Sequence, residues 1–294
     1  MKDDRLQEIL RKVRRLDLMA RTRSRERVAG QYHSRFKGQG IDFADHRAYL
    51  PGDDVRAIDW NVTARMPEPY IRTFEEEREM TVYLLVDISP STGYGSIDSS
   101  KRELAAEAAA TIAFSAQNNH DKTGLILYGH DVEYMLPAAK GRPHVLRLLR
   151  EILYRRSGPG VTRPATALKA LQTAVRRHAL AFLIGDMIGE DFSDTLKPAA
   201  RRHEIIGLRI EDPAEAKPPD VGWACLEDPE TGQSAVVNTS DPVLRQRLAQ
   251  SHLRWAAEID STFGRLGCAS ATLRTDADPA RALQALLQRR SRPA

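Results

Sequence analysis

Two runs of β-forming apolar residues constrain the fold of this chain more than any other feature. Thr81–Val86 reads TVYLLV and Ala179–Ile184 reads ALAFLI, and in neither run do apolar residues alternate with polar ones. Strands without alternation are typical of a sheet that is covered on both faces, as in parallel α/β proteins. We therefore expect a central parallel sheet that contains both runs.

Predicted helices and strands alternate along the chain from about residue 70. The predicted helices lie near 99–118, 142–155, 164–177 and 192–201, and the predicted strands near 123–127, 132–136 and 204–210. After a Pro-rich loop, the remaining predictions are a hairpin of 221–226 and 234–237, a helix at 242–266, a strand at 269–273 and a helix at 279–289. This order predicts the α/β class, with a doubly wound, mostly parallel sheet and helices on both faces.

The first part of the chain has a different character. Residues 3–20 place apolar side chains at near-helical spacing with Arg and Lys between them, which predicts a basic helix. Residues 28–60 lose this rhythm and predict an ordered, irregular segment. We expect residues 1–69 to form the helix and this segment, and residues 70–294 to form the sheet domain. Residues 211–294 could be an appended part, but the alternation favours an extension of the sheet, completed by Ala269–Leu273.

Positive charge gathers in the N-terminal segment. The chain has a formal net charge of +4, yet residues 1–37 alone carry twelve Lys and Arg against five Asp and Glu. Such asymmetry fits an acidic partner, a nucleic acid or a membrane surface, and a solvated basic helix explains it equally well. The residues that could contact phosphates are Arg11, Lys12, Arg14, Arg15, Arg21, Arg23, Arg25 and Arg27. Few aromatic residues lie between them and no recognition motif is present, so we expect no specific nucleic-acid binding.

Cysteine usage and hydropathy bear on the cellular location. Cys225 and Cys268 form neither a disulfide framework nor a zinc-binding pattern, and their apolar neighbours predict buried thiols. No apolar run approaches the ~20 residues that span a bilayer. The first residues lack the apolar region of a signal peptide. We therefore expect a cytoplasmic protein that does not insert into a membrane.

Oxygen-bearing side chains follow both buried strands. TVYLLV runs directly into Asp87-Ile88-Ser89-Pro90-Ser91, and ALAFLI ends in Gly185-Asp186. A Gly-rich loop that ends in Thr162 precedes the helix leading to the second strand. Taken singly, Thr162 and Asp186 are explained as turn and capping residues. Because the carboxyl ends of parallel strands meet at one edge of a sheet, the three segments together predict a site for Mg²⁺ or Mn²⁺.

This constellation resembles the metal-ion-dependent adhesion site of von Willebrand factor A-type domains. The resemblance implies that Asp87, Ser89 and Ser91 are direct ligands, and that Thr162 and Asp186 bind the metal directly or through water. It also implies that an acidic side chain of a protein partner takes the open coordination position. Thr92 occupies a position where the family often has Met, and this difference does not affect any of the expected metal ligands.

The segment before the first buried strand resembles the hallmark of the bacterial domain of unknown function fifty-eight family. The matching positions are Gly38, Gly40, Asp42, Phe43, Arg47, Tyr49, Pro51, Gly52, Asp53, Asp54, Arg56, Ile58, Asp59, Trp60, Ala64, Arg65 and Phe74-Glu75-Glu76-Glu77-Arg78. The resemblance implies a partnership with a MoxR-type AAA+ ATPase in protein assembly or activation.

Physically, Pro51-Gly52-Asp53-Asp54 predicts a turn. We expect the charged residues around this turn to form an ion-pair network that fixes the segment on the sheet domain, with Tyr49 and Trp60 as apolar anchors. In the alternative, Asp53 and Asp54 extend the metal site or face a partner.

The leading functional hypothesis is a non-catalytic adaptor that binds an acidic group on a partner or client through a divalent metal ion. One alternative is a Mg²⁺-dependent phosphoryl-transfer enzyme with Asp87 as nucleophile, although Ser89 stands where a general acid would be needed. Another is a basic nucleic-acid-binding protein. The sequence contains no phosphate-binding loop of the Walker type and no nucleophile elbow, which argues against ATP hydrolysis and against hydrolase chemistry.

Overall fold

The computed structural model describes residues 42–50, 53–75, 79–97 and 99–289. Contacts between residues separate a small unit, Phe36–Met80, from the sheet domain that begins at Thr81. The small unit takes in residues 70–80, so the boundary lies beyond the expected position after residue 69. The basic helix expected at residues 3–20 lies outside the described residues.

The small unit is built on a two-stranded antiparallel sheet. Strand β1 (Asp42–Ala48) pairs with β2 (Tyr70–Glu75), and the connection holds the 3-10 helix η2 (Val55–Ala57) and the short helix α3 (Trp60–Thr63). The expectation of an irregular segment over residues 28–60 is therefore wrong for β1. Its sequence, DFADHRA, lacks the apolar alternation that reveals a half-buried strand.

The charged residues of this unit serve local purposes. Arg47 and Asp53 form a bidentate ion pair with both N–O distances at 2.7 Å, which confirms one pair of the expected network. Asp54 and Asp59 cap η2 and α3 by accepting hydrogen bonds from backbone amides. Trp60 is 66% exposed, so within the small unit its ring is not part of an apolar core. It is the first residue of a helix of only four residues, which leaves its ring outside a packed layer.

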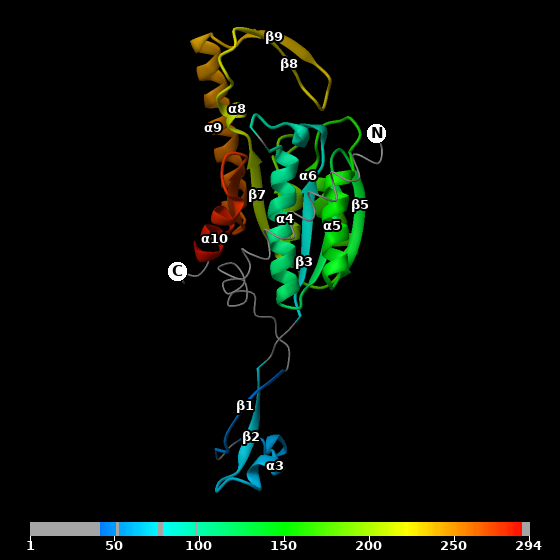
Figure 1. The fold of residues 1–294 in the computed structure, drawn as a ribbon, viewed down its shortest axis with the longest axis vertical. Helices are drawn as coiled ribbons and strands as arrows, with labels where there is room; N and C mark the ends of the chain where they lie inside the picture. The colour runs from blue at the N-terminus through cyan, green and yellow to red at the C-terminus, as the bar shows by residue number, and fades with distance from the viewer. Residues whose placement is uncertain (1–41, 51–52, 76–78, 98, 290–294) are drawn as a thin grey trace. The chain divides into compact units, whose positions relative to one another are not determined.

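The second unit contains a six-stranded sheet in the order β10-β7-β6-β3-β4-β5, shown in Figure 1. Its strands are β3 (Thr81–Asp87), β4 (Lys122–Tyr128), β5 (Val132–Ala139), β6 (Leu180–Gly185), β7 (Glu204–Glu211) and β10 (Ala269–Arg274). All neighbours are parallel except β4 and β5. β4 lies on one side of β3 and β6 on the other, so the order of strands reverses between β3 and β6. Such a switch point is where doubly wound sheets place their sites.

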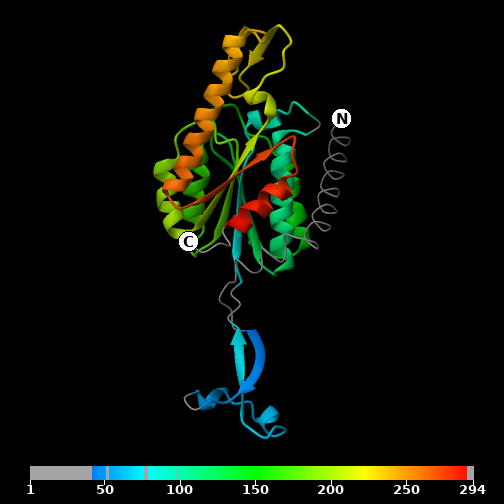
Figure 2. The same ribbon diagram turned by 90° about the vertical axis from the view of Figure 1, so that its left-hand side faces the viewer.

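Helices cover both faces of this sheet, which confirms the expected fold class. One face carries α4 (Lys101–Asn118), α5 (Arg142–Tyr154) and α10 (Pro279–Arg289), while the other carries α6 (Pro164–Ala174), α7 (Ser193–Arg202) and α9 (Pro242–Arg265). Figure 2 shows the two layers on either side of the sheet. Leu168, Leu196 and Phe263 bring three helices of the second face into one apolar cluster with the strands. Every helix among the described residues is too short or too polar to cross a lipid bilayer.

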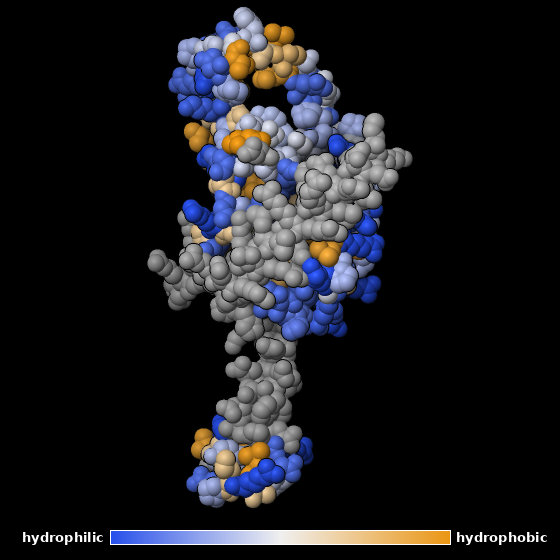
Figure 3. All heavy atoms as spheres, viewed as in Figure 1, coloured by the Kyte–Doolittle hydropathy of each residue, from blue (hydrophilic) through white to orange (hydrophobic). Residues whose placement is uncertain are grey.

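Residues beyond β7 extend the sheet and also add a separate hairpin. β10 pairs with β7 and completes the sheet, as expected. The expected hairpin forms from β8 (Trp223–Glu227) and β9 (Ser234–Asn238), after the short helix α8 (Pro213–Ala216), but it pairs with no strand of the main sheet. Apolar side chains gather over it in Figure 3, and Trp223 and Val236 are 74% and 68% exposed. Cys225 is exposed as well, contrary to the expected buried thiol, because no second layer covers the hairpin.

His203, between α7 and β7, gives the unit a sensitivity to acid. Its side chain is buried, and both ring nitrogens lack hydrogen-bond partners among the described residues. Burial, helped by the nearby charge of Arg202, lowers the pKa of His203 from 6.5 to about 4. Between pH 6.5 and about pH 4, His203 is therefore protonated in the unfolded chain but neutral in the folded protein. Stability from the neutral ring is fully present above pH 6.5 and is lost as the pH falls toward 4.

We expect His203→Leu to remove this sensitivity. In urea unfolding at pH 7 and pH 5, the wild type should lose about 1–2 kcal/mol more than the variant over this interval. His120→Gln, at an exposed histidine that does not affect the pKa of His203, is the matched control and should behave as the wild type does. Equal acid sensitivity of His203→Leu and the wild type would show that other groups carry it.

Candidate metal centre

Asp87 ends the central strand β3 and begins a tightly folded loop. Its side chain is fully buried, and its Oδ1 accepts a hydrogen bond from the backbone amide of Ser89 at 2.8 Å. The 3-10 helix η3 (Pro90–Gly93) follows, and the buried Thr92 hydroxyl donates to the Ser89 carbonyl at 2.7 Å. Thr92 therefore holds the turn that places Ser89 and Ser91 beside Asp87.

Arg102, on the first turn of α4, ties this loop to the helix. Its guanidinium donates to the carbonyls of Ile88 and Arg155, and to the Thr92 hydroxyl at 3.2 Å. The capping box of Ser100 and Glu103 fixes where α4 begins, and thus where Arg102 stands. A single arginine therefore contacts the loop on either side of Ser89, at the Ile88 carbonyl and the Thr92 hydroxyl.

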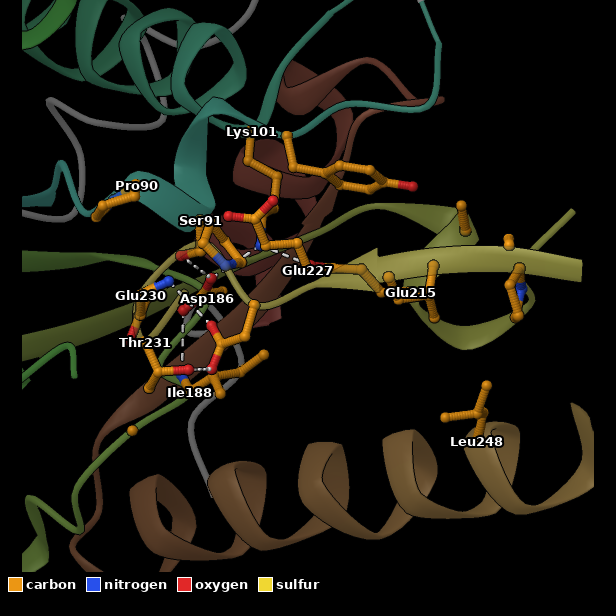
Figure 4. Close-up of a pocket in the computed structure, with 18 of the residues that line it drawn as sticks. Pro90, Ser91, Lys101, Asp186, Ile188, Glu215, Glu227, Glu230, Thr231 and Leu248 are labelled. Atoms are coloured by element: carbon orange, nitrogen blue, oxygen red, sulfur yellow. Dashed lines mark hydrogen bonds and ion pairs between the residues drawn. The ribbon is translucent and has the colours of Figure 1, made fainter. Parts of the chain in front are cut away.

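Asp186 joins the loop from the end of β6. Its Oδ2 accepts hydrogen bonds from the Ser91 hydroxyl at 3.0 Å and from the Lys101 ammonium at 2.8 Å (Figure 4). Lys101 is only 2% exposed and also binds Glu215 at 2.5 Å. Burial opposes the charged ammonium, but Asp186 and Glu215 outweigh it and raise the pKa of Lys101 above its ordinary value. The lysine thus stays protonated and compensates Asp186.

The second carboxylate oxygen of Asp87 has no such compensation. Oδ2 is buried and accepts no hydrogen bond among the described residues. Burial first, and then the charge of Asp186, raise the pKa of Asp87 to about 8. An ionised carboxylate in this position calls for a positive charge, and a divalent cation beside Oδ2 would supply it.

Gly185 leaves the space that Asp87 needs. A Cβ at this position would lie 2.7 Å from Cβ of Asp87, 3.1 Å from its Oδ2 and 2.9 Å from the hydroxyl oxygen of Tyr128. The Tyr128 hydroxyl is itself buried without a hydrogen-bond partner in the described part of the chain. Glycine before Asp186 thus leaves room beside two buried oxygens that lack hydrogen bonds among the described residues.

The donor set fits Mg²⁺ or Mn²⁺. The hydroxyl oxygens of Ser89 and Ser91 lie 3.0 Å apart. The Ser91 hydroxyl oxygen lies 3.0 Å from Oδ2 of Asp186. Adjacent oxygens around an octahedral Mg²⁺ with bonds of about 2.0–2.1 Å are about 3 Å apart, so a cation could replace these hydrogen bonds without large movement. All the donors are hard oxygens, which suits these ions.

Four of the five residues predicted as ligands are linked by direct hydrogen bonds: Asp87, Ser89, Ser91 and Asp186. Thr162 is buried at the loop before α6, and its described bonds go to Glu230, a residue of the β8–β9 turn that also contributes to the electrostatics of Asp87. Sequence reasoning did not identify Lys101, Arg102 or Glu230. The capping box before Lys101 was a usable signal for the first two, but nothing in the sequence relates Glu230 to Thr162.

Comparison with known proteins gives a family match and two informative relatives. The family model for proteins of unknown function DUF58 matches residues 45–258. The uncharacterized protein Rv1480 of Mycobacterium tuberculosis is 33% identical over 269 residues, which cover 90% of this chain and 84% of the relative. The uncharacterized protein YeaD of Bacillus subtilis is 28% identical over 109 residues, which cover 37% of this chain and 25% of YeaD.

Solved structures resemble the chain at low sequence identity. The conserved hypothetical protein BatB from Bacteroides thetaiotaomicron has a TM-score of 0.44 at 15% identity, over 71% of this chain and 98% of BatB. The VWA domain of SpRpn10 has a TM-score of 0.40 at 13% identity, over 72% of this chain and 95% of that domain.

Proposed function

The chain belongs to the DUF58 family, a family of unknown function, and we propose that it is a non-catalytic protein-interaction module whose site at the end of β3 holds Mg²⁺ or Mn²⁺. The observation that carries this proposal is the buried Oδ2 of Asp87, which has no hydrogen-bond partner among the described residues, next to the buried carboxylate of Asp186, whose charge helps to raise the pKa of Asp87. Asp87, Ser89, Ser91, Thr162 and Asp186 would hold the ion.

The arrangement suits binding better than group transfer. Asp87 is fully buried and its Oδ1 is engaged by the Ser89 amide, which hinders attack on a substrate. The position two residues on, which a phosphoryl-transfer enzyme would use for a general acid, is a serine. A bound divalent ion with two neutral serine ligands would remain electrophilic toward an incoming carboxylate.

We further propose that the acidic group comes from a protein partner or client, and that a MoxR-type AAA+ ATPase works with this chain in protein assembly or activation. Support for the ATPase comes from the family resemblance of the sequence. Support for an acidic ligand comes from the charge balance of the loaded site. Lys101 already compensates Asp186, so Asp87 would neutralise only part of the charge of a divalent ion, which would still attract an anionic ligand.

We expect retention of a purified MoxR-type ATPase on the immobilised chain to be at least about tenfold stronger in Mg²⁺ than in EDTA, equivalent to about 1.4 kcal/mol of binding free energy. Asp87→Asn should reduce retention in Mg²⁺ to the EDTA level, because the ion is lost. Asp131→Asn, which removes an exposed carboxylate in the turn after β4, is the control and should bind as the wild type does. Retention that is strong and indifferent to EDTA would reject a metal-mediated contact.

A further inference from the structure

The turn of the β8–β9 hairpin closes onto the loop that carries Thr162. The Glu230 carboxylate accepts hydrogen bonds from the Thr162 amide at 2.9 Å and from the Thr162 hydroxyl at 2.5 Å. The Glu230 carbonyl accepts a third bond from the Gly160 amide at 3.1 Å. Glu230 therefore reaches into the candidate metal centre from a segment 68 residues away along the chain (Figure 4).

The turn that presents Glu230 is itself well ordered by internal bonds. Asp228 accepts hydrogen bonds from the Glu230 amide at 2.9 Å and from the Thr231 hydroxyl at 2.6 Å. Gly232 closes the turn with a φ of +70°, a conformation that glycine adopts without strain. The position of Glu230 is thus set by the hairpin rather than by chance contact of a long side chain.

The contact places a further carboxylate at the candidate metal centre. Glu230 lines the same cavity as Asp186, and like charges placed together repel each other. The described bonds that hold it come from neutral donors of Thr162 and Gly160. A divalent ion between these groups would turn the repulsion into attraction.

We propose that Glu230 is an acidic ligand supplied by the chain itself, which occupies the position at the metal centre that a partner's carboxylate would take. The inference rests on the proposed metal-binding function and adds a ligand and a means of control. With Glu230 in place the hairpin closes the site, and a partner must displace it.

A cavity beneath the hairpin shows where the displacing group would enter. It has a volume of about 740 Å³ and lies between the hairpin, α8 and the carboxyl edge of the sheet. Apolar side chains such as Pro218, Val221 and Leu226 line it, while Ser91 and Asp186 form a polar part of its wall. A partner's acidic side chain could reach the centre through this space and exchange with Glu230.

The test is titration of Mn²⁺ alone into the full chain by calorimetry, comparing the wild type with Glu230→Gln and Glu258→Gln. Glu258 lies on α9, is exposed and does not line the cavity, so its variant matches the change in charge away from the site. We expect Glu230→Gln to weaken Mn²⁺ binding about 10- to 100-fold, as the loss of a metal-site partner does, and Glu258→Gln to change it less than about twofold. Equal affinities of Glu230→Gln and the wild type would overturn this inference and leave the metal centre standing. A wild type that binds no Mn²⁺ would overturn both.

Hydrogen–deuterium exchange of residues 223–238 gives a second readout. Mn²⁺ should slow exchange of the hairpin amides in the wild type and in Glu258→Gln, relative to EDTA, and should have little effect in Glu230→Gln. Exchange that ignores Mn²⁺ in a wild type shown to bind it would mean that the hairpin does not close through Glu230.

Discussion

Asp87→Asn is expected to abolish the stabilisation of this protein by divalent metal. At a Mg²⁺ or Mn²⁺ concentration of ~100 times the dissociation constant, binding stabilises the folded wild type by about 2.7 kcal/mol. For a unit of this size that free energy corresponds to a rise of about 5–10 °C in the thermal midpoint. The variant should show no rise, because the anionic ligand at the centre of the site is gone. Thermal unfolding in EDTA and in excess metal measures the difference.

Without metal, we expect Asp87→Asn to keep or increase the stability of the protein at pH 8, whereas a mutation that only damaged the fold would lower it. The pKa of Asp87 is raised from 3.8 to about 8, so the folded protein holds a proton that the unfolded chain releases. In EDTA, this group's contribution to stability is present below about pH 4 and declines as the pH rises to about 8. Asp87→Asn removes that decline, and at pH 8 the variant should be at least as stable as the wild type. Asp131→Asn serves as control for both measurements. A variant that is unstable in EDTA, or a metal response that survives it, would refute the assignment.

Lys101→Met is expected to cause the largest loss of stability in metal-free protein. Lys101 and Asp186 are 2% and 1% exposed, and their ion pair is 2.8 Å long. Removing one partner of a buried pair leaves the other charge uncompensated, at a cost of about 3–5 kcal/mol. Urea unfolding in EDTA measures this loss. Excess Mn²⁺ should restore part of it, because a cation beside Asp186 replaces the missing ammonium.

Two further variants keep this prediction testable if Lys101→Met folds poorly. The double variant Lys101→Met with Asp186→Asn removes both charges and should lose less stability than Lys101→Met alone. Lys169→Met changes an exposed lysine on α6 and should cost less than about 0.5 kcal/mol. A loss of under about 1 kcal/mol in Lys101→Met would show that the buried pair has little energetic role.

The sheet domain could be predicted because its signals are local. The unbroken apolar runs of β3 and β6 indicate strands that are covered on both faces. Asp87 at the end of β3 and Asp186 directly after β6 then lie at the same edge of the sheet. Strand β1 of the small unit gave no such signal, because apolar and polar residues do not alternate in its sequence DFADHRA. Local pattern therefore identified the strands of the main sheet and the β8–β9 hairpin, and missed strand β1.

The rest of the candidate site depends on long-range contacts. Lys101 meets Asp186 across 85 residues of sequence, and Glu230 meets Thr162 across 68. No sequence motif links Lys101 to Asp186 or Glu230 to Thr162. A lysine at the start of a helix and a glutamate in a turn are ordinarily exposed to solvent. Only the paths of α4 and the β8–β9 hairpin bring these charges to the centre. The charges of Lys101 and Glu230 set the electrostatics of the site, and the sequence alone did not show that these residues lie there.

The position of β10 has a consequence for how the protein is made. β10 is the last strand of the described residues, yet it pairs with β7, whose residue Ile206 is opposite Ala269 in the parallel ladder. During synthesis β7 emerges with one edge unpaired, and it stays so while the hairpin and α9 are added. Unpaired edges of apolar strands recruit other chains. The nascent protein thus passes through an interval of exposure to aggregation that ends only when β10 has left the ribosome, and chaperones that shield this edge would matter most in that interval.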